Sequence, residues 1–138
     1  MLGQGGNDRL TGGDLNDSLN GGTGQDMLMD GAGADGFVFD AGLVAGYADH
    51  IADFRAVADT VHLLRTEPEP FRALAFGVLR AKACNVGMVA IKAGQHILYD
   101  RETGLLACDG EGAGSVLPQV FASLDHGPGI GAADFFVL

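Results

Sequence analysis

The chain opens with four consecutive copies of a nine-residue unit, and every copy has aspartate at its sixth position. The copies span residues 3–11, 12–20, 21–29 and 30–38. The sixth positions are Asp8, Asp17, Asp26 and Asp35, and the apolar eighth positions are Leu10, Leu19, Leu28 and Phe37. A fixed period of this kind predicts a repeat architecture, in which stacked units bury one continuous core.

Each unit divides into a turn of about six residues and a strand of about three. In so short a strand the middle side chain points to one face, so the apolar eighth position is predicted to lie inside. Turn glycines allow positive φ, which lets carbonyl oxygens converge. With an aspartate in every turn, these oxygens match the preference of Ca²⁺ for about six to eight oxygen ligands.

Two other interpretations of the repeat are weaker. A flexible Gly/Asp-rich linker has a similar composition, but it needs no apolar residue in phase with the aspartates. A repeat that stacks without metal would bring aspartates together in a partly dry gap, and no basic residue is expected nearby to neutralise them. The calcium interpretation is therefore favoured.

The charge is concentrated on the repeats and the segment that follows them. Residues 1–60 contain ten acidic residues against two basic ones, whereas residues 61–138 contain eight acidic and six basic ones. This acidic surface argues against nucleic acid and anionic membranes as partners and favours cations. No run approaches the roughly 20 apolar residues of a membrane span.

The sequence after the repeats carries further motifs. They are Phe37–Asp40, the D-x-I-x-D-F segment 49–54, D-x-V-x-L at 59–63, and the segments 97–100, 103–104, 109–114, 119–124 and 132–135. With the repeats, they resemble the C-terminal region of hemolysin-type calcium-binding (RTX) proteins, including the C-terminal domains of serralysin-type proteases. The resemblance covers nearly the whole chain and is weakest over residues 64–96.

The resemblance implies an all-β fold. In that family two nonapeptides make one turn of a right-handed parallel β-roll, which here would span residues 1–40. Residues 41–138 would form a β-sandwich-like capping region that continues the same domain. The helical spacing of Phe71, Leu74, Ala75, Val78 and Leu79 predicts one short helix after Pro70, ending before Asn85 or Gly87. They also predict strands at 51–54, 60–64, 86–91, 95–99, 105–108 and 135–138, with 100–104 as a hairpin turn.

The resemblance also implies about two calcium sites, each between repeats n and n+2. One site would use Gln4, Gly6 and Asp8 with Gly21, Thr23 and Asp26, and the other Gly13, Leu15 and Asp17 with Asp30, Ala32 and Asp35. Most of these ligands would be backbone carbonyls. Gln4, Leu15 and Asp30 replace usual glycines. Leu15 is expected at positive φ, at a cost of about 1–2 kcal/mol, so the first site ranks higher. Asp26 is also a candidate for a third site with later residues.

No catalytic constellation is evident, so the chain is predicted not to be an enzyme. The H-E-x-x-H zinc motif is missing, and the four histidines stand singly. Cys84 and Cys108 are interpreted as small buried apolar residues, and their pairing stays open. The segment 109–114 is interpreted as an acidic turn in preference to a cation loop.

These features predict a calcium-dependent folding and export module of a secreted, extracellular bacterial protein. Its partners would be calcium ions and the type I secretion machinery, and it would be a monomer. The segment Asp134, Phe135, Phe136, Val137 and Leu138 resembles the family's uncleaved C-terminal signal, or it is a plain strand. The start inside a repeat, without a signal peptide, indicates a fragment or a short product. Alternatives are the tail of a secreted enzyme (protease, lipase or polysaccharide-modifying) and part of a calcium-stiffened adhesin.

Overall fold

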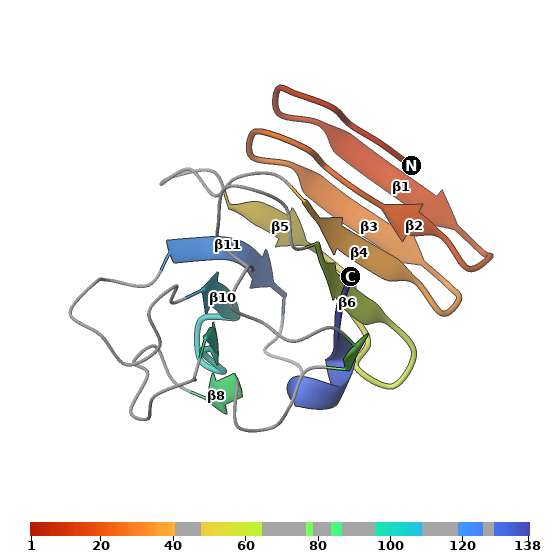
Figure 1. The fold of residues 1–138 in the computed structure, drawn as a ribbon. Helices are drawn as coiled ribbons and strands as arrows, with labels where there is room; N and C mark the ends of the chain where they lie inside the picture. Colours follow the sequence, from red (N-terminus) through yellow and green to blue (C-terminus); the bar gives the residue numbers. More distant parts are fainter. Residues whose placement is uncertain (41–47, 65–76, 79–83, 87–95, 109–118, 126–128) are drawn as a thin grey trace.

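The computed structural model describes residues 1–40, 48–64, 77–78, 84–86, 96–108, 119–125 and 129–138. These residues form an all-β structure of two sheets with both parallel and antiparallel neighbours (Figure 1). Within the described ranges the helical content is the short 3-10 helix Ala132–Asp134. The all-β expectation is therefore confirmed.

The larger sheet has seven strands in the order β1-β3-β5-β11-β10-β9-β8. Its strands are β1 (Arg9–Gly13), β3 (Met27–Gly31), β5 (Asp49–Ile51), β8 (Cys84–Val86), β9 (Ile97–Tyr99), β10 (Leu105–Cys108) and β11 (Gln119–Leu124). The smaller sheet has five strands in the order β2-β4-β6-β12-β7. They are β2 (Ser18–Leu19), β4 (Gly36–Phe39), β6 (Thr60–Leu63), β7 (Gly77–Val78) and β12 (Phe135–Val137).

The first six strands alternate between the two sheets, and neighbours within each sheet are parallel. Each repeat contributes one strand, so a residue lies beside the equivalent residue two repeats later. The apolar eighth positions therefore stack in register, Leu10 beside Leu28 in one sheet and Leu19 beside Phe37 in the other, and Ile51 and Val61 continue the two stacks after the repeats. All six are buried in one core, as the nine-residue period predicts for the first four.

The last strands extend both sheets of the repeat region. Strand β11 joins β5 in parallel, and β12 joins β6 in parallel. Phe121 of β11 contacts Phe39 of β4 edge-on, with ring centroids 5.1 Å apart, so one aromatic pair links the two sheets. The repeats and the C-terminal strands consequently share a single hydrophobic core.

Several local expectations can be compared with these strands. The β9–β10 hairpin is antiparallel, and the amide of Gly104 donates to the carbonyl of Asp100 at 2.8 Å, which confirms the predicted turn. Val78 was expected in a helix but lies in β7, antiparallel to β12, because pairing with a distant strand overrides a local helical period. The other residues of the predicted helix, 71–76 and 79–83, lie outside the described residues. So do residues 87–95, which include most of the strand predicted at 86–91.

No described helix has the length and apolar character needed to cross a membrane.

Candidate metal centre

The turns of the repeats follow a regular backbone pattern. Positive φ occurs at the second position of every repeat and at the fourth position of three repeats: Gln4, Gly13, Gly22 and Gly31, then Gly6, Gly24 and Gly33. Leu15 occupies the remaining fourth position without positive φ, so the expectation of strain at Leu15 is wrong. Gln4, with φ of 80°, is the non-glycine residue with positive φ in the described part of the chain. A leucine at the fourth position is accommodated because its turn changes conformation, which leaves the side chain exposed.

The aspartates form two hydrogen-bonded columns. In the first column, Asp26 Oδ1 accepts the amide of Asp8 at 2.7 Å, and Asp49 Oδ1 accepts the amide of Asp26 at 3.1 Å. In the second column, Asp35 Oδ1 accepts the amide of Asp17 at 2.7 Å, and Asp59 Oδ1 accepts the amide of Asp35 at 3.3 Å. The carboxylates of Asp26, Asp35, Asp49 and Asp59 thus each hold an earlier turn with one oxygen.

The second oxygen of several carboxylates is buried and has no hydrogen-bond partner. This holds for the Oδ2 atoms of Asp8, Asp26, Asp30 and Asp35. Burying such an oxygen without a partner is costly, and buried charges in proteins are normally paired or bound to metal. The arrangement therefore suits a cation that accepts oxygen ligands.

Glycine at the first position of a repeat leaves room for the carboxylate of the same repeat. A β-carbon at Gly21 would lie 2.3 Å from Asp26 Oδ2, and one at Gly12 would lie 2.9 Å from Asp17 Oδ2. The fourth repeat differs because its first position is Asp30. In the earlier repeats a β-carbon at this position would clash with the aspartate of the same repeat, and at Gly3 and Gly12 it would also lie 2.5 and 2.6 Å from a backbone carbonyl oxygen two repeats later.

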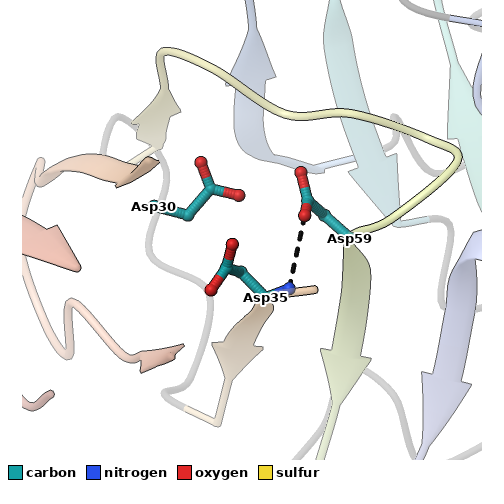
Figure 2. Close-up of side chains that lie close together, drawn as sticks. All are labelled: Asp30, Asp35 and Asp59. Carbon is teal, nitrogen blue, oxygen red and sulfur yellow. Dashed lines mark hydrogen bonds between the residues drawn. The ribbon is translucent and has the colours of Figure 1, made fainter. Parts of the chain in front are cut away.

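Asp30, Asp35 and Asp59 form a compact group, called here the terminal cluster. Each offers a carboxylate oxygen, and these oxygens all lie within 4.8 Å of one another. Figure 2 shows the three carboxylates facing one another from β3, from the turn before β4 and from the loop before β6. All three residues are buried.

Arg55 stands at the side of this cluster. Its guanidinium lies 4.0 Å from Asp35 Oδ2 and 3.8 Å from Asp59 Oδ2, and it donates to the carbonyl of Gly33 at 2.9 Å. The expectation that no basic residue lies near the aspartates is therefore wrong at this end of the repeats. The sequence period could not reveal Arg55, because the loop that carries it lies outside the repeats.

Two carboxyl groups in the structure have strongly raised pKa values. Burial, with contributions from the hydrogen bonds and charges of Asp53 and Asp59, raises the pKa of Asp30 from 3.8 to about 8. Burial also raises the pKa of Asp49 to about 7, outweighing the hydrogen bond from the Asp26 amide. Without a cation, these two carboxyl groups therefore keep their protons up to about neutral pH, where an ordinary aspartate is ionised.

The structure brings together the turns of both predicted ligand sets. In the first set, the Gln4 carbonyl accepts the Thr23 amide at 2.9 Å, and the Thr23 carbonyl accepts the Gly6 amide at 2.9 Å. In the second set, the Gly13 carbonyl accepts the Ala32 amide at 2.8 Å. A carbonyl has two lone pairs, so these hydrogen bonds leave one for a metal. Two other predicted ligand residues differ in burial. Gly21, from the first set, is buried beside Asp26, whereas Leu15, from the second set, is exposed.

Asp49, Asp53 and Asp59 were not predicted to lie beside the repeat aspartates, although a sequence signal for two of them exists. In every repeat the aspartate stands two residues before the inward apolar residue. Asp49 precedes Ile51 and Asp59 precedes Val61 at the same spacing. Asp26 therefore meets a later residue, Asp49, as the suggestion of a third site requires.

The other predicted functional residues lie elsewhere. Asp134 accepts the amide of Gly131 at 2.7 Å, and Phe135 and Val137 are buried in β12, between β6 and β7. The terminal segment is thus an interior strand of the smaller sheet. The predicted acidic turn at 109–114 lies outside the described residues.

The two cysteines flank the same strand. Cys84 and Cys108 are both register partners of Ile97, on opposite sides of β9. Their Cα atoms are thus two strand spacings apart, about 9.6 Å. This exceeds the roughly 7 Å between Cα atoms that a disulfide normally spans. Cys108 is buried, as expected.

The sequence did not predict a hydrogen-bonded group of His50, Ser123 and Asp125, because its members are far apart in the chain. His50 Nδ1 lies 2.9 Å from Ser123 Oγ, and His50 Nε2 lies 3.1 Å from Asp125 Oδ1. His50 and Ser123 are register partners of the parallel pair β5–β11. The group fastens the C-terminal strands to the repeat region across that pair.

No protein-family model matches this chain, and no curated protein matches it.

Proposed function

We propose that this chain is a calcium-binding module whose folding depends on the ion, as the resemblance to RTX proteins implies. The observation that carries the proposal is the pair of aspartate columns. One oxygen of Asp26 and one of Asp35 hold a turn of an earlier repeat, while the Oδ2 atoms of Asp8, Asp26 and Asp35 are buried without hydrogen-bond partners. Carboxylates beside turn carbonyls are ligands for a hard cation.

The energetics favour a fold that needs the ion. Two ionised carboxylates at about 4–5 Å repel by about 3–4 kcal/mol at an effective dielectric constant of about 20. A domain is stable by only about 5–15 kcal/mol, so a few such pairs oppose folding unless a cation or protons neutralise them. The free energy of calcium binding is then part of the free energy of folding.

The strand arrangement supports a parallel β-roll for the repeats. Successive strands alternate between two sheets, and parallel neighbours are two repeats apart. Two nonapeptides per turn, with a right-handed path, would give this pairing. Ile51 and Val61 continue the two apolar stacks, so the proposed roll extends beyond residue 40 to β6.

The proposed cellular role follows from the calcium gradient. Extracellular modules bind Ca²⁺ at about 10⁻⁴–10⁻³ M, so the repeats stay unfolded in a calcium-poor cytosol and fold outside the cell. An unfolded chain suits export through a type I channel, led by residues 134–138. After export, the same residues become the interior strand β12.

Circular dichroism of the full chain tests the calcium dependence. We expect calcium-free protein at pH 7.5 to lose β signal and to regain it with millimolar Ca²⁺, while Mg²⁺ at the same concentration restores less. Mg²⁺ demands a near-ideal octahedral site and gives up its water reluctantly. A spectrum that is unchanged between chelator and Ca²⁺ would refute the proposal.

A further inference from the structure

We propose that the terminal cluster of Asp30, Asp35 and Asp59 is a divalent-cation site built mainly from side-chain carboxylates, and that its ion fastens the 53–59 loop to the last repeat. This inference rests on the proposed calcium function but goes beyond the repeat sites. In the ligand set that the resemblance implies, Asp30 would contribute only its backbone carbonyl, and Asp59 would contribute nothing.

Asp30 is the residue that makes this site different. The other three repeats have glycine at the same position: Gly3, Gly12 and Gly21. The Asp30 side chain is 0% exposed, so it is not a solvated surface charge. A carboxylate is the least favourable side chain to bury without a partner, so its place in this interior indicates a ligand.

The position of the Asp30 carboxylate is held from both sides. Its Oδ1 accepts the amide of Gly31 at 2.8 Å, and its own amide donates to Asp53 Oδ1 at 3.0 Å. Its Oδ2 is buried without a hydrogen-bond partner, as is the Oδ2 of Asp35, which is 3% exposed. Two unsatisfied oxygens from different strands therefore meet in one interior space (Figure 2).

Arg55 does not satisfy these oxygens. Its distances of 4.0 and 3.8 Å to Asp35 and Asp59 are those of loose ion pairs, and its side chain is 44% exposed. The guanidinium contributes one positive charge at the rim of a group of three carboxylates. A divalent cation inside the cluster balances the remaining charge.

The cluster is compact enough for one Ca²⁺ ion to contact all three carboxylates. The three oxygens lie within 4.8 Å of one another. Ligands on opposite sides of a Ca²⁺ ion, each about 2.3–2.6 Å away, can lie up to about 4.6–5.2 Å apart.

The same residues connect the last repeat to the loop that enters β6. Asp53 accepts the amides of Asp30 and Gly31, each at 3.0 Å. Asp59 accepts the amides of Asp35 at 3.3 Å and Arg55 at 2.7 Å. An ion held by Asp30, Asp35 and Asp59 therefore fixes the Asp59 end of the 53–59 loop against β3 and the β4 turn, while hydrogen bonds hold the Asp53 end beside Asp30.

The test counts calcium ions bound to the full chain. Equilibrium dialysis and titration calorimetry with Ca²⁺ are applied to the wild type, to Asp30→Gly and to Asp14→Asn as a control. Asp30→Gly restores the residue of the other repeats, and Asp14 is an exposed acidic residue outside both columns. We expect Asp30→Gly to bind one ion fewer per chain, while Asp14→Asn binds as many as the wild type.

Hydrogen exchange gives a second readout. In saturating Ca²⁺, the Arg55 and Asp35 amides should exchange at least about tenfold faster in Asp30→Gly, while the Asp8 amide keeps its protection. If Asp30→Gly does not fold, Asp30→Asn keeps the size and should weaken one binding event at least tenfold. If the variant that folds binds as many ions as the wild type with the same affinity, this inference is overturned but the proposed function is not. A wild type that binds no Ca²⁺ would overturn the proposed function as well.

Discussion

The carboxylate of Asp26 accepts the backbone amide of Asp8 at 2.7 Å, so the third repeat holds the turn of the first. The other oxygen of Asp26 is buried without a hydrogen-bond partner. One side chain therefore combines a structural contact, which any acceptor could make, with a negative charge, which only a cation or a proton can neutralise. This division of roles makes the proposals testable by isosteric substitution.

Asp26→Asn should have opposite effects with and without calcium. The amide oxygen can still accept the Asp8 amide, while the buried charge is gone. We expect the calcium-free variant to retain more β structure than the wild type, and its folding midpoint in a Ca²⁺ titration to rise at least tenfold, or about 1.4 kcal/mol. Circular dichroism measures both. Equal calcium midpoints for variant and wild type would contradict the ligand role of Asp26.

Acid should partly replace calcium. The folded-state pKa values of Asp30 and Asp49, about 8 and about 7, exceed their ordinary value of 3.8. Between about pH 4 and 8 the folded chain therefore binds more protons than the unfolded chain, and the free energy of unfolding falls as pH rises. We expect calcium-free protein to gain β signal when the pH is lowered from 8 to 5.

With saturating Ca²⁺ the pH dependence should be much weaker or reversed, because the ion binds deprotonated carboxylates and its affinity rises with pH. Asp30→Asn supplies the control, since it should flatten the calcium-free curve. A calcium-free chain that becomes more ordered from pH 5 to pH 8 would show that these carboxyl groups do not oppose folding.

Truncating Leu28 should lower the free energy of unfolding more than truncating most other core residues of the repeats. It is fully buried and lies between Leu10 and Ile51 in one apolar stack. Leu28→Ala should lower the free energy of unfolding by about 2–5 kcal/mol, measured by urea denaturation in saturating Ca²⁺. Leu15→Ala is the matched control, because Leu15 is 77% exposed; its effect should stay within about 0.5 kcal/mol. Similar losses for both would contradict the inward direction of the eighth position.

Gln4→Gly should stabilise the protein. Gln4 has φ of 80°, which costs a residue with a β-carbon about 1–2 kcal/mol. We expect a gain of about 1 kcal/mol in saturating Ca²⁺, reduced by the greater chain entropy that glycine adds to the unfolded state. Leu15→Gly should give no gain, since Leu15 is not at positive φ. Greater stabilisation from Leu15→Gly than from Gln4→Gly would contradict the turn conformations.

Part of the candidate metal centre could be predicted because its aspartates repeat. Asp8, Asp17, Asp26 and Asp35 recur with their inward apolar residues, and stacking must place equivalent residues side by side. Asp49 and Asp59 keep the two-residue spacing to Ile51 and Val61, but the period around them is broken. Arg55 and Asp53 follow no period at all, since their positions depend on a loop.

The amino-acid sequence by itself determined the inward residues of the repeats and the concentration of carboxylates in the turns, because both follow from a nine-residue period and local backbone preference. The all-β class was predicted from the resemblance of the motifs to RTX proteins. Only the tertiary structure decided that Gln4 has a positive φ whereas Leu15 does not, and that Val78 belongs to a strand. It also decided that Asp30, Asp35 and Asp59 meet beside Arg55. Those outcomes depend on contacts between residues distant in the chain, whose free energies outweigh local preferences.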